Sequence, residues 1–289
     1  MNPLQKTKSG YLFFDGAMGT MLAANGLAVN EGAEIFNIKA PGIVQKIHTE
    51  YVNAGADIVT TNTFGANAKK LSKYNLTAEE MIITAVVLAK NSGAEFVALG
   101  MGPIGELIEP YGDLTPEEAY DLFKEQAVAG ENAGADMALI ETMSDLQEAV
   151  IAVKAVKENT MLPVGCTMSF EQSGHTFMGV DPATAIKSLE EAGVDAVGFN
   201  CSLGPKEAIK IAEEFAKYSK LPLIAQPNAG LPEIVDGKSV YVITPREFCD
   251  NMKEIADRGF RIFGGCCGTT PEFIKELKNR LPRKLFSSG

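Results

Sequence analysis

Three cysteines follow short apolar segments, where their thiols can reach a shared ligand. Cys266 and Cys267 are adjacent within the glycine-rich run 264–270, and Cys201 follows another apolar run. Neighbouring side chains on an extended strand point to opposite faces, so adjacent thiols can meet one target only where glycines let the backbone turn. Three thiolates with room for a fourth ligand are the layout of a catalytic zinc site. The alternative, that these cysteines are small buried hydrophobic residues, stays open.

Two acidic residues are expected at the ends of other strands. Asp15 follows the first apolar run and Glu141 follows the fourth. A buried carboxylate needs a partner, and no neighbouring motif supplies an arginine or lysine, so a substrate ammonium group is a candidate. The alternatives are a helix cap at Asp15, or internal hydrogen bonds and salt bridges at either residue. The N–H groups of Gly16, Ala17 and Met18 open the next helix and can hold a substrate carboxylate.

Asn228 is expected at the end of the seventh strand, between the strands that carry the cysteines. Its amide oxygen is a candidate metal ligand when substrate is absent, and a turn-forming asparagine is the alternative. The glycine-rich run 264–270 offers a second alternative, a phosphate cradle, because barrel phosphate sites form after strands seven and eight. Acceptors for an ammonium and a carboxylate group, together with a thiophilic metal, suit an amino acid that bears a thiol.

The elements that must position these residues repeat along the chain. Five times a predicted helix stops at a glycine and a short apolar strand follows, at residues 58–60, 96–99, 137–140, 196–199 and 261–263. The first strand and two strands that contain a proline complete the set, at 11–14, 162–168 and 221–226. The helical patterns lie near 42–54, 78–91, 116–132, 145–157, 182–191, 205–218, 245–257 and 271–279.

Eight strand–helix units predict an α/β fold of the (β/α)8 TIM barrel type, in which catalytic groups come from the C-terminal ends of the strands. We expect one domain, 1–289, with 283–289 as a flexible tail and 100–115 as a flap over the mouth. A doubly wound open sheet is the alternative, but residues 15–20 lack the glycine fingerprint that usually follows its first strand.

The composition is that of a soluble globular protein, with 46% hydrophobic and 22% charged residues. A formal charge of -11 argues against a nucleic-acid or anionic-membrane partner. No apolar run approaches the roughly 20 residues that span a bilayer, and residues 1–10 contain no signal-peptide core. Five cysteines are an odd number for a disulfide framework, which favours a reducing, cytoplasmic location. Two of them, Cys166 and Cys249, are expected to serve packing.

The cysteine-bearing segments resemble the zinc-dependent homocysteine S-methyltransferase family. The likeness covers nearly the whole chain, and its matching segments are DGAMGT at 15–20, GFNCS at 198–202 and GGCCGTTP at 264–271. Within the family, the chain most resembles the N-terminal homocysteine-binding modules of cobalamin-dependent methionine synthases. The segments that carry this closer likeness are 18–22, 109–113 and 226–230.

The resemblance implies a zinc ion held by Cys201, Cys266 and Cys267, with homocysteine sulfur as the fourth ligand. It also implies that Asn228 takes the fourth position when homocysteine is away. By the same resemblance, Asp15 and Glu141 help to hold the amino acid, and main-chain donors at 16–18 take its carboxylate.

The implied activity is a methyltransferase reaction that converts homocysteine to methionine. The implied donor is methylcobalamin, and the implied partners are cobalamin-binding and methyltetrahydrofolate-binding modules or proteins. The chain stops after the eighth unit, so we expect an excised module or a stand-alone subunit. Three alternatives remain open: S-methylmethionine or betaine as the donor, a non-catalytic subunit that binds homocysteine or zinc, and a phosphate-binding barrel lyase or isomerase without zinc.

Overall fold

Eight short parallel strands form the wall of a barrel in this computed structural model, which describes residues 2–28, 31–235 and 238–281. Their order around the sheet is β1-β10-β7-β6-β5-β4-β3-β2, and a bridge between Phe14 and Ile58 joins the two outer strands. The strands are β1 (Leu12–Phe13), β2 (Ile58–Thr60), β3 (Phe96–Met101), β4 (Met137–Met143), β5 (Val164–Met168), β6 (Ala196–Asn200), β7 (Leu223–Gln226) and β10 (Ile262–Phe263). The predicted (β/α)8 barrel is therefore confirmed, whereas the predicted tail 283–289 lies outside the described residues.

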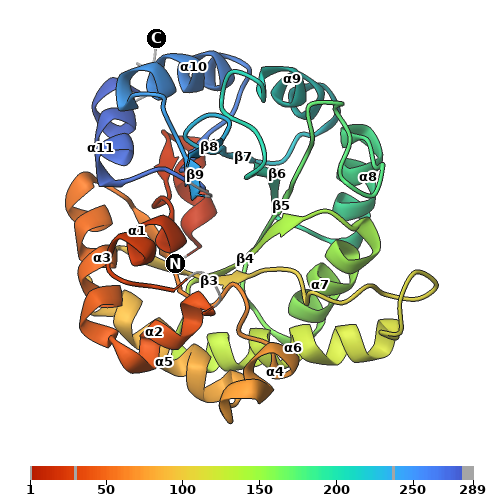
Figure 1. The fold of residues 1–289 in the computed structure, drawn as a ribbon. Helices are drawn as coiled ribbons and strands as arrows, with labels where there is room; N and C mark the ends of the chain where they lie inside the picture. The colour runs from red at the N-terminus through yellow and green to blue at the C-terminus, as the bar shows by residue number, and fades with distance from the viewer. Residues whose placement is uncertain (1, 29–30, 236–237, 282–289) are drawn as a thin grey trace.

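Helices surround the barrel, as Figure 1 shows in a view along its axis. The eight expected helices are α3 (Pro41–Ala54), α5 (Ala78–Lys90), α6 (Pro116–Ala133), α7 (Leu146–Asn159), α8 (Pro182–Ala192), α9 (Ile209–Tyr218), α10 (Pro245–Asp257) and α11 (Pro271–Arg280). Capping explains several starts, because Thr77 and Thr115 each form a capping box with the glutamate three residues on. The helix expected from 205 begins at 209, since 205–208 form a turn. None of the described helices has both the length and the apolarity that a bilayer crossing requires.

The segment before β1 and the loops after the strands contain short elements that the sequence patterns did not predict. They are η1 (Pro3–Lys8), α1 (Met18–Ala24), η2 (Ala33–Ile35), α2 (Phe36–Lys39), α4 (Ala68–Leu71) and η3 (Ser72–Tyr74), together with an antiparallel hairpin of β8 (Glu233–Val235) and β9 (Lys238–Val240). Figure 1 shows the hairpin and α1 on the viewer's side of the barrel. Apart from η1, which precedes β1 and contacts the start of β3 through Lys6, these elements lie at the rim of the barrel mouth.

The core has two layers, one inside the barrel and one between the sheet and the helices. Leu4 of η1 packs with the strand side chains of the inner cluster, such as Leu12 and Phe96, and contributes to its packing. Gly198 of β6 has no room for a side chain, because a Cβ there would lie 1.9 Å from the carbonyl oxygen of Ile224. The bare glycine lets β6 lie closely against β7, and the two strands end beside each other at the mouth.

The expectation that 100–115 forms a flap over the mouth is wrong. In Figure 1 the segment between β3 and α6 runs outward past α7 and turns back at the edge of the molecule. The backbone N–H of Ile104 donates to the carboxylate of Glu148 on α7 at 2.7 Å, which ties the segment to the outer layer of helices. The barrel mouth is therefore open on this side.

Candidate active site

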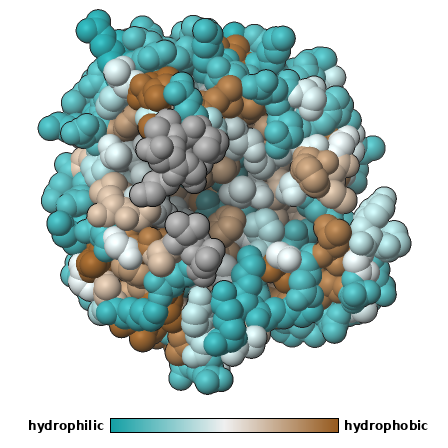
Figure 2. All heavy atoms as spheres, in the orientation of Figure 1, coloured by the Kyte–Doolittle hydropathy of each residue, from teal (hydrophilic) through white to brown (hydrophobic). Residues whose placement is uncertain are grey.

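A cavity of about 440 Å³ lies at the C-terminal ends of the strands, where the sequence predicts the site. Figure 2 looks onto this end of the molecule and shows it hollowed near its centre. Eight of the nine predicted site residues line the cavity: Asp15, Gly16, Ala17, Met18, Glu141, Cys201, Cys266 and Cys267. Asn228 is the exception, since it is buried beside the cavity rather than in its lining.

The three thiols converge as predicted. The sulfur atoms of Cys201, Cys266 and Cys267 all lie within 4.8 Å of one another, and those of Cys201 and Cys267 are 3.8 Å apart. A tetrahedral zinc ion with Zn–S bonds of about 2.3 Å requires sulfur separations of roughly 3.8 Å. The donor set and its spacing therefore fit zinc, and a role in packing alone does not account for thiols that face a cavity.

The backbone around the cysteine pair is held by the end of β7. The N–H of Cys266 donates to the carbonyl of Pro227, and the N–H of Ala229 donates to the carbonyl of Cys267, both at 2.9 Å. Asn228 lies between these two contacts, and its side-chain oxygen is buried without a hydrogen-bond partner among the described residues. A buried carbonyl oxygen without a described partner, on the segment that holds the cysteine pair, is a candidate for a labile metal ligand.

The phosphate-cradle alternative does not fit the run 264–270. The N–H groups of four of its residues donate to other protein atoms: Gly264 to Ala225, Gly265 to Asp15, Gly268 to Thr20 and Thr269 to Cys266. With the N–H of Cys266 also engaged, the turn has few donors left for an anion. Its hydrogen bonds fix the thiols instead.

The thiols also share charge with one another. Hydrogen bonds from Cys201 and then Cys266 lower the pKa of the Cys267 thiol to about 3. Hydrogen bonds to Cys201 and Cys267 raise the pKa of Cys266, and the pKa of Cys201 is raised to about 11. One thiolate is therefore present without a metal, and a cation would have to displace the protons of the other two thiols.

Asp15 and Glu141 lie on one side of the cavity. Thr60 donates to the carboxylate of Asp15 through its N–H at 2.8 Å and its hydroxyl at 3.1 Å. A Cβ built on Gly100 would lie 2.9 Å from Cγ2 of Thr60 and 3.1 Å from Oε1 of Glu141, so both carboxyl groups are near Thr60. Asp15 does not cap the following helix, because the N-cap of α1 is Ala17 and no side chain bonds there.

Within the described part of the chain, both carboxyl groups lack a cationic partner. No lysine or arginine in the described residues lies within ion-pair distance of Asp15 or Glu141. Burial raises the pKa of Asp15 to about 7. Burial, followed by the charges of Asp15 and Cys267, raises the pKa of Glu141 to about 8. An incoming ammonium group would relieve this strain and restore both negative charges.

The main-chain N–H groups of residues 16–18 are only partly available to a substrate carboxylate. The N–H of Ala17 donates to the hydroxyl of Thr269 at 3.1 Å. Gly16 and Met18 line the cavity on either side of it, and α1 begins at Met18 without a side-chain cap. A substrate carboxylate would therefore meet the N–H groups next to Ala17.

Sequence patterns did not single out several residues of this site. Asn200 hydrogen-bonds across three strand ends, Gln226 has a buried amide oxygen without a described partner, and the ring of Tyr241 packs against the position of Gly268. Lys70 and Phe64 line the outer part of the cavity. A polar residue at the last position of a strand was the available signal for Asn200 and Gln226, whereas no motif marks Tyr241.

Comparisons with known proteins identify the family of the chain. The model of the homocysteine S-methyltransferase family matches residues 12–281. The chain belongs to this family. It is 32% identical to methionine synthases of Mycobacterium leprae, over 291 residues, and Mycobacterium tuberculosis, over 285 residues. The alignments cover 93% and 91% of this chain but 24% of each relative, so the chain spans about a quarter of their length.

The fold is also that of a solved relative. The metallated form of the homocysteine methyltransferase MmuM from Escherichia coli superposes with a TM-score of 0.82 at 23% identity, covering 96% of this chain and 100% of that one. This likeness supports the barrel architecture.

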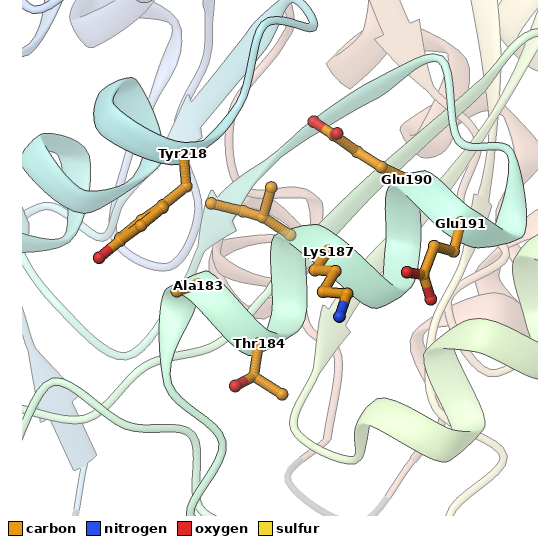
Figure 3. Close-up of a pocket in the computed structure, with 7 residues that line it drawn as sticks. Ala183, Thr184, Lys187, Glu190, Glu191 and Tyr218 are labelled. Carbon is orange, nitrogen blue, oxygen red and sulfur yellow. The ribbon is translucent and has the colours of Figure 1, made fainter.

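A second hollow, of about 680 Å³, lies outside the homocysteine S-methyltransferase barrel between α8 and α9. Figure 3 shows Thr184, Lys187 and Glu191 on α8, with Tyr218 of α9 across from them. The hydroxyl of Ser219 donates to Glu190 at 2.6 Å and links the two helices. This hollow lacks the converging thiols and carboxyl groups of the mouth, so we assign its side chains a structural role.

The stability of the metal-free homocysteine S-methyltransferase barrel is expected to depend on pH through Glu141. Its pKa is about 8 in the folded state against an ordinary value of 4.5, so between these values the folded state binds the proton more tightly than the unfolded state. The stabilisation from the protonated carboxyl is therefore complete below the unfolded pKa and is lost as the pH rises through about 8. The variant Glu141→Gln cannot ionise, so it should gain stability relative to wild type between about pH 5 and pH 9.

Urea denaturation of both proteins across this range measures the difference in unfolding free energy. A difference that stays constant with pH would show that the folded state does not raise the pKa of Glu141.

Proposed function

We propose that this chain transfers a methyl group to the sulfur of homocysteine and so forms methionine, with zinc as its metal and methylcobalamin as the donor. The supporting observation is that one cavity holds three converging thiols and two carboxyl groups that have no cationic partner among the described residues. These groups complement the thiol and the ammonium of a single amino acid. Membership in the homocysteine S-methyltransferase family points to the same substrate.

Cys201, Cys266 and Cys267 would hold the zinc ion. When bound, zinc keeps the homocysteine sulfur in its thiolate form near neutral pH, where a free thiol is mostly protonated. Asn228 is suited to be a labile fourth ligand, because its buried oxygen has no other partner among the described residues and the Cys266–Pro227 and Ala229–Cys267 contacts flank it.

The remaining groups orient the amino acid. Asp15 and Glu141 accept the ammonium group, and the N–H groups of Gly16 and Met18 are offered to the carboxylate. These contacts fix the α-carbon end of the amino acid, and the proposed zinc site would hold its sulfur at the other end, facing the mouth. The lone pair of the thiolate would then form the new S–C bond while the bond between the methyl carbon and the donor breaks, and the electron pair of the broken bond stays with the donor.

The open mouth favours a large donor. A cavity of about 440 Å³ admits homocysteine but not a corrinoid, so methylcobalamin must present its methyl group from outside. We therefore propose a cobalamin-binding module or protein as the partner, with a methyltetrahydrofolate-binding one to recharge it. The chain spans about a quarter of its methionine synthase relatives, which leaves such modules to other polypeptide regions or proteins. Five free thiols suit the reducing conditions of the cytoplasm.

The test is a donor comparison with the zinc-loaded chain. Homocysteine is incubated with methylcobalamin, S-methylmethionine or betaine at matched concentrations, and methionine is measured by mass spectrometry. We expect methionine from methylcobalamin and only background from the two small donors. Turnover confined to a small donor would overturn the donor assignment. Homocysteine binding without product from any of the three, or from a protein-bound methylcorrinoid, would make the chain a non-catalytic subunit.

A further inference from the structure

Asn200, the last residue of β6, has every hydrogen-bonding position of its buried side chain in use. Its amide oxygen accepts from the N–H of Thr142 and from the hydroxyl of Thr167, both at 2.8 Å. Its amide nitrogen donates to the hydroxyl of Thr142 at 2.7 Å and faces the sulfur of Cys266 at 3.8 Å. A backbone N–H can only donate, so the oxygen must face Thr142 and the NH₂ group must face the thiol.

On one side, Asn200 holds an irregular part of β4. The register between β4 and β5 shifts between Ile140 and Met143, and Thr142 has a φ of 61° in the left-handed region. A β-branched residue adopts this conformation only when its surroundings enforce it. Asn200 binds both the N–H and the hydroxyl of Thr142, which replaces the ladder contacts that the irregularity removes.

The hydrogen bonds between Asn200 and Thr142 also set the direction of the Glu141 side chain. The N–H of Thr142 belongs to the peptide group that directly follows Glu141, so fixing this peptide plane fixes the backbone from which the Glu141 side chain projects. The carboxyl group of Glu141 has no hydrogen bond of its own among those the described residues form. Its position in the cavity therefore depends on the backbone that Asn200 holds.

On the other side, Asn200 meets a thiol of the proposed metal site. Its N–H···S contact with Cys266 joins β6 to the turn after β10. Asn200 is thus in direct contact both with the residue next to Glu141 and with a proposed zinc ligand. Among the described residues, no other side chain is bonded to both Thr142 and Cys266.

We propose that Asn200 is a positioning residue that holds Glu141 and Cys266 at a fixed separation and thereby selects homocysteine over cysteine. The inference rests on the proposed function, in which the ammonium group is bound at Glu141 and the sulfur at the thiol cluster. Cysteine has the same two groups but one methylene fewer between them. With both anchors fixed, cysteine cannot reach both, and one methylene is generally worth about 10- to 200-fold in discrimination.

The test compares the affinities of L-homocysteine and L-cysteine by calorimetry on zinc-loaded protein, with zinc content measured for each variant. Asn200→Ala removes the side-chain contacts with both Thr142 and Cys266. Thr142→Gly removes the hydroxyl contact and makes a φ of 61° easy, so it loosens the Glu141 side while Asn200 still faces Cys266. Thr167→Val is the matched control, because it removes one hydrogen bond of Asn200 but leaves its contacts with Thr142 and Cys266 in place.

We expect wild type to bind homocysteine at least about tenfold more tightly than cysteine. The ratio should fall to within about threefold in Asn200→Ala and Thr142→Gly, and should stay within about twofold of wild type in Thr167→Val. A general loss of stability would weaken both ligands equally and leave the ratio unchanged, so the ratio isolates positioning from folding.

The outcomes separate this inference from the proposed function. Wild-type protein that binds no homocysteine would refute the proposed function itself. Wild-type protein that binds both amino acids equally, or an Asn200→Ala protein that keeps its zinc and its ratio, would refute the inference alone. If Asn200→Ala does not retain zinc, Thr142→Gly decides, and an unchanged ratio there overturns the role of Asn200.

Discussion

Replacing Cys266 by alanine is expected to abolish zinc binding and methyl transfer. The three sulfur atoms within 4.8 Å of one another leave no spare thiol to substitute for a lost one, because Cys166 and Cys249 are buried elsewhere. Zinc content should fall from about one ion per chain to below about 0.1, measured by elemental analysis after dialysis. Methionine formation should fall at least about a thousandfold, since the sulfur loses both its thiolate form and its fixed position.

Cys249→Ala is the matched control for this substitution. Its thiol lies on α10 and donates to the carbonyl of Glu276, away from the cavity. This variant should keep about one zinc ion per chain. Full zinc occupancy in Cys266→Ala, with a native circular dichroism spectrum, would show that the thiol cluster is not the metal site.

Replacing Glu141 by glutamine is expected to weaken homocysteine binding at least about 30-fold. Glutamine keeps the volume of the side chain but removes the negative charge that faces the ammonium group. Loss of one partner from a buried charge pair costs about 2–5 kcal/mol, and each 1.4 kcal/mol is a factor of ten in the dissociation constant. Calorimetric titration of the zinc-loaded protein measures this change, and zinc content should remain at the wild-type level.

Two controls define the origin of this loss. The des-amino analogue 4-mercaptobutyrate has no ammonium group, so Glu141→Gln should bind it as wild type does. Glu148 is also buried with a pKa of about 7, but it accepts from Ile104 and does not line the cavity. Glu148→Gln should therefore bind homocysteine within about twofold of wild type. Equal losses for homocysteine and 4-mercaptobutyrate would place the ammonium group away from Glu141.

The strands were predictable because each is a short apolar run between a helix stop and a polar residue. Such runs must be buried on both faces, and eight of them with intervening helices leave the barrel as the favoured arrangement. The hairpin of β8 and β9 gave no comparable signal, since polar residues such as Glu233 and Lys238 occur in its strands. The outward course of the segment 100–115 could not be predicted from the sequence either, because it depends on the contact between Ile104 and Glu148.

The positions of the thiols and carboxyl groups followed from the same logic, since the ends of parallel strands meet at one face of the barrel. The hydrogen-bond partners of these groups could not be predicted in this way. The engaged N–H of Ala17 and the orphaned oxygen of Asn228 are set by contacts with residues far away in sequence. The role of Asn200 depends on the left-handed backbone of Thr142, which no residue pattern reveals for a β-branched side chain.

Asp15 lies where β1 and β2, the two outer strands of the sheet, meet and close the barrel. In the described part of the chain, hydrogen bonds between Phe13 and Asp57 and the bridge between Phe14 and Ile58 connect β1 to β2. The two hydrogen bonds from Thr60 to Asp15 come next along that join. One carboxyl group thus stabilises the barrel wall and also lines the cavity where we propose that the amino acid binds. Loss of the Asp15 carboxyl group would therefore remove hydrogen bonds of the barrel wall and also weaken the proposed binding of the amino acid, whereas the Glu141 carboxyl group forms no hydrogen bond to the wall among the described residues.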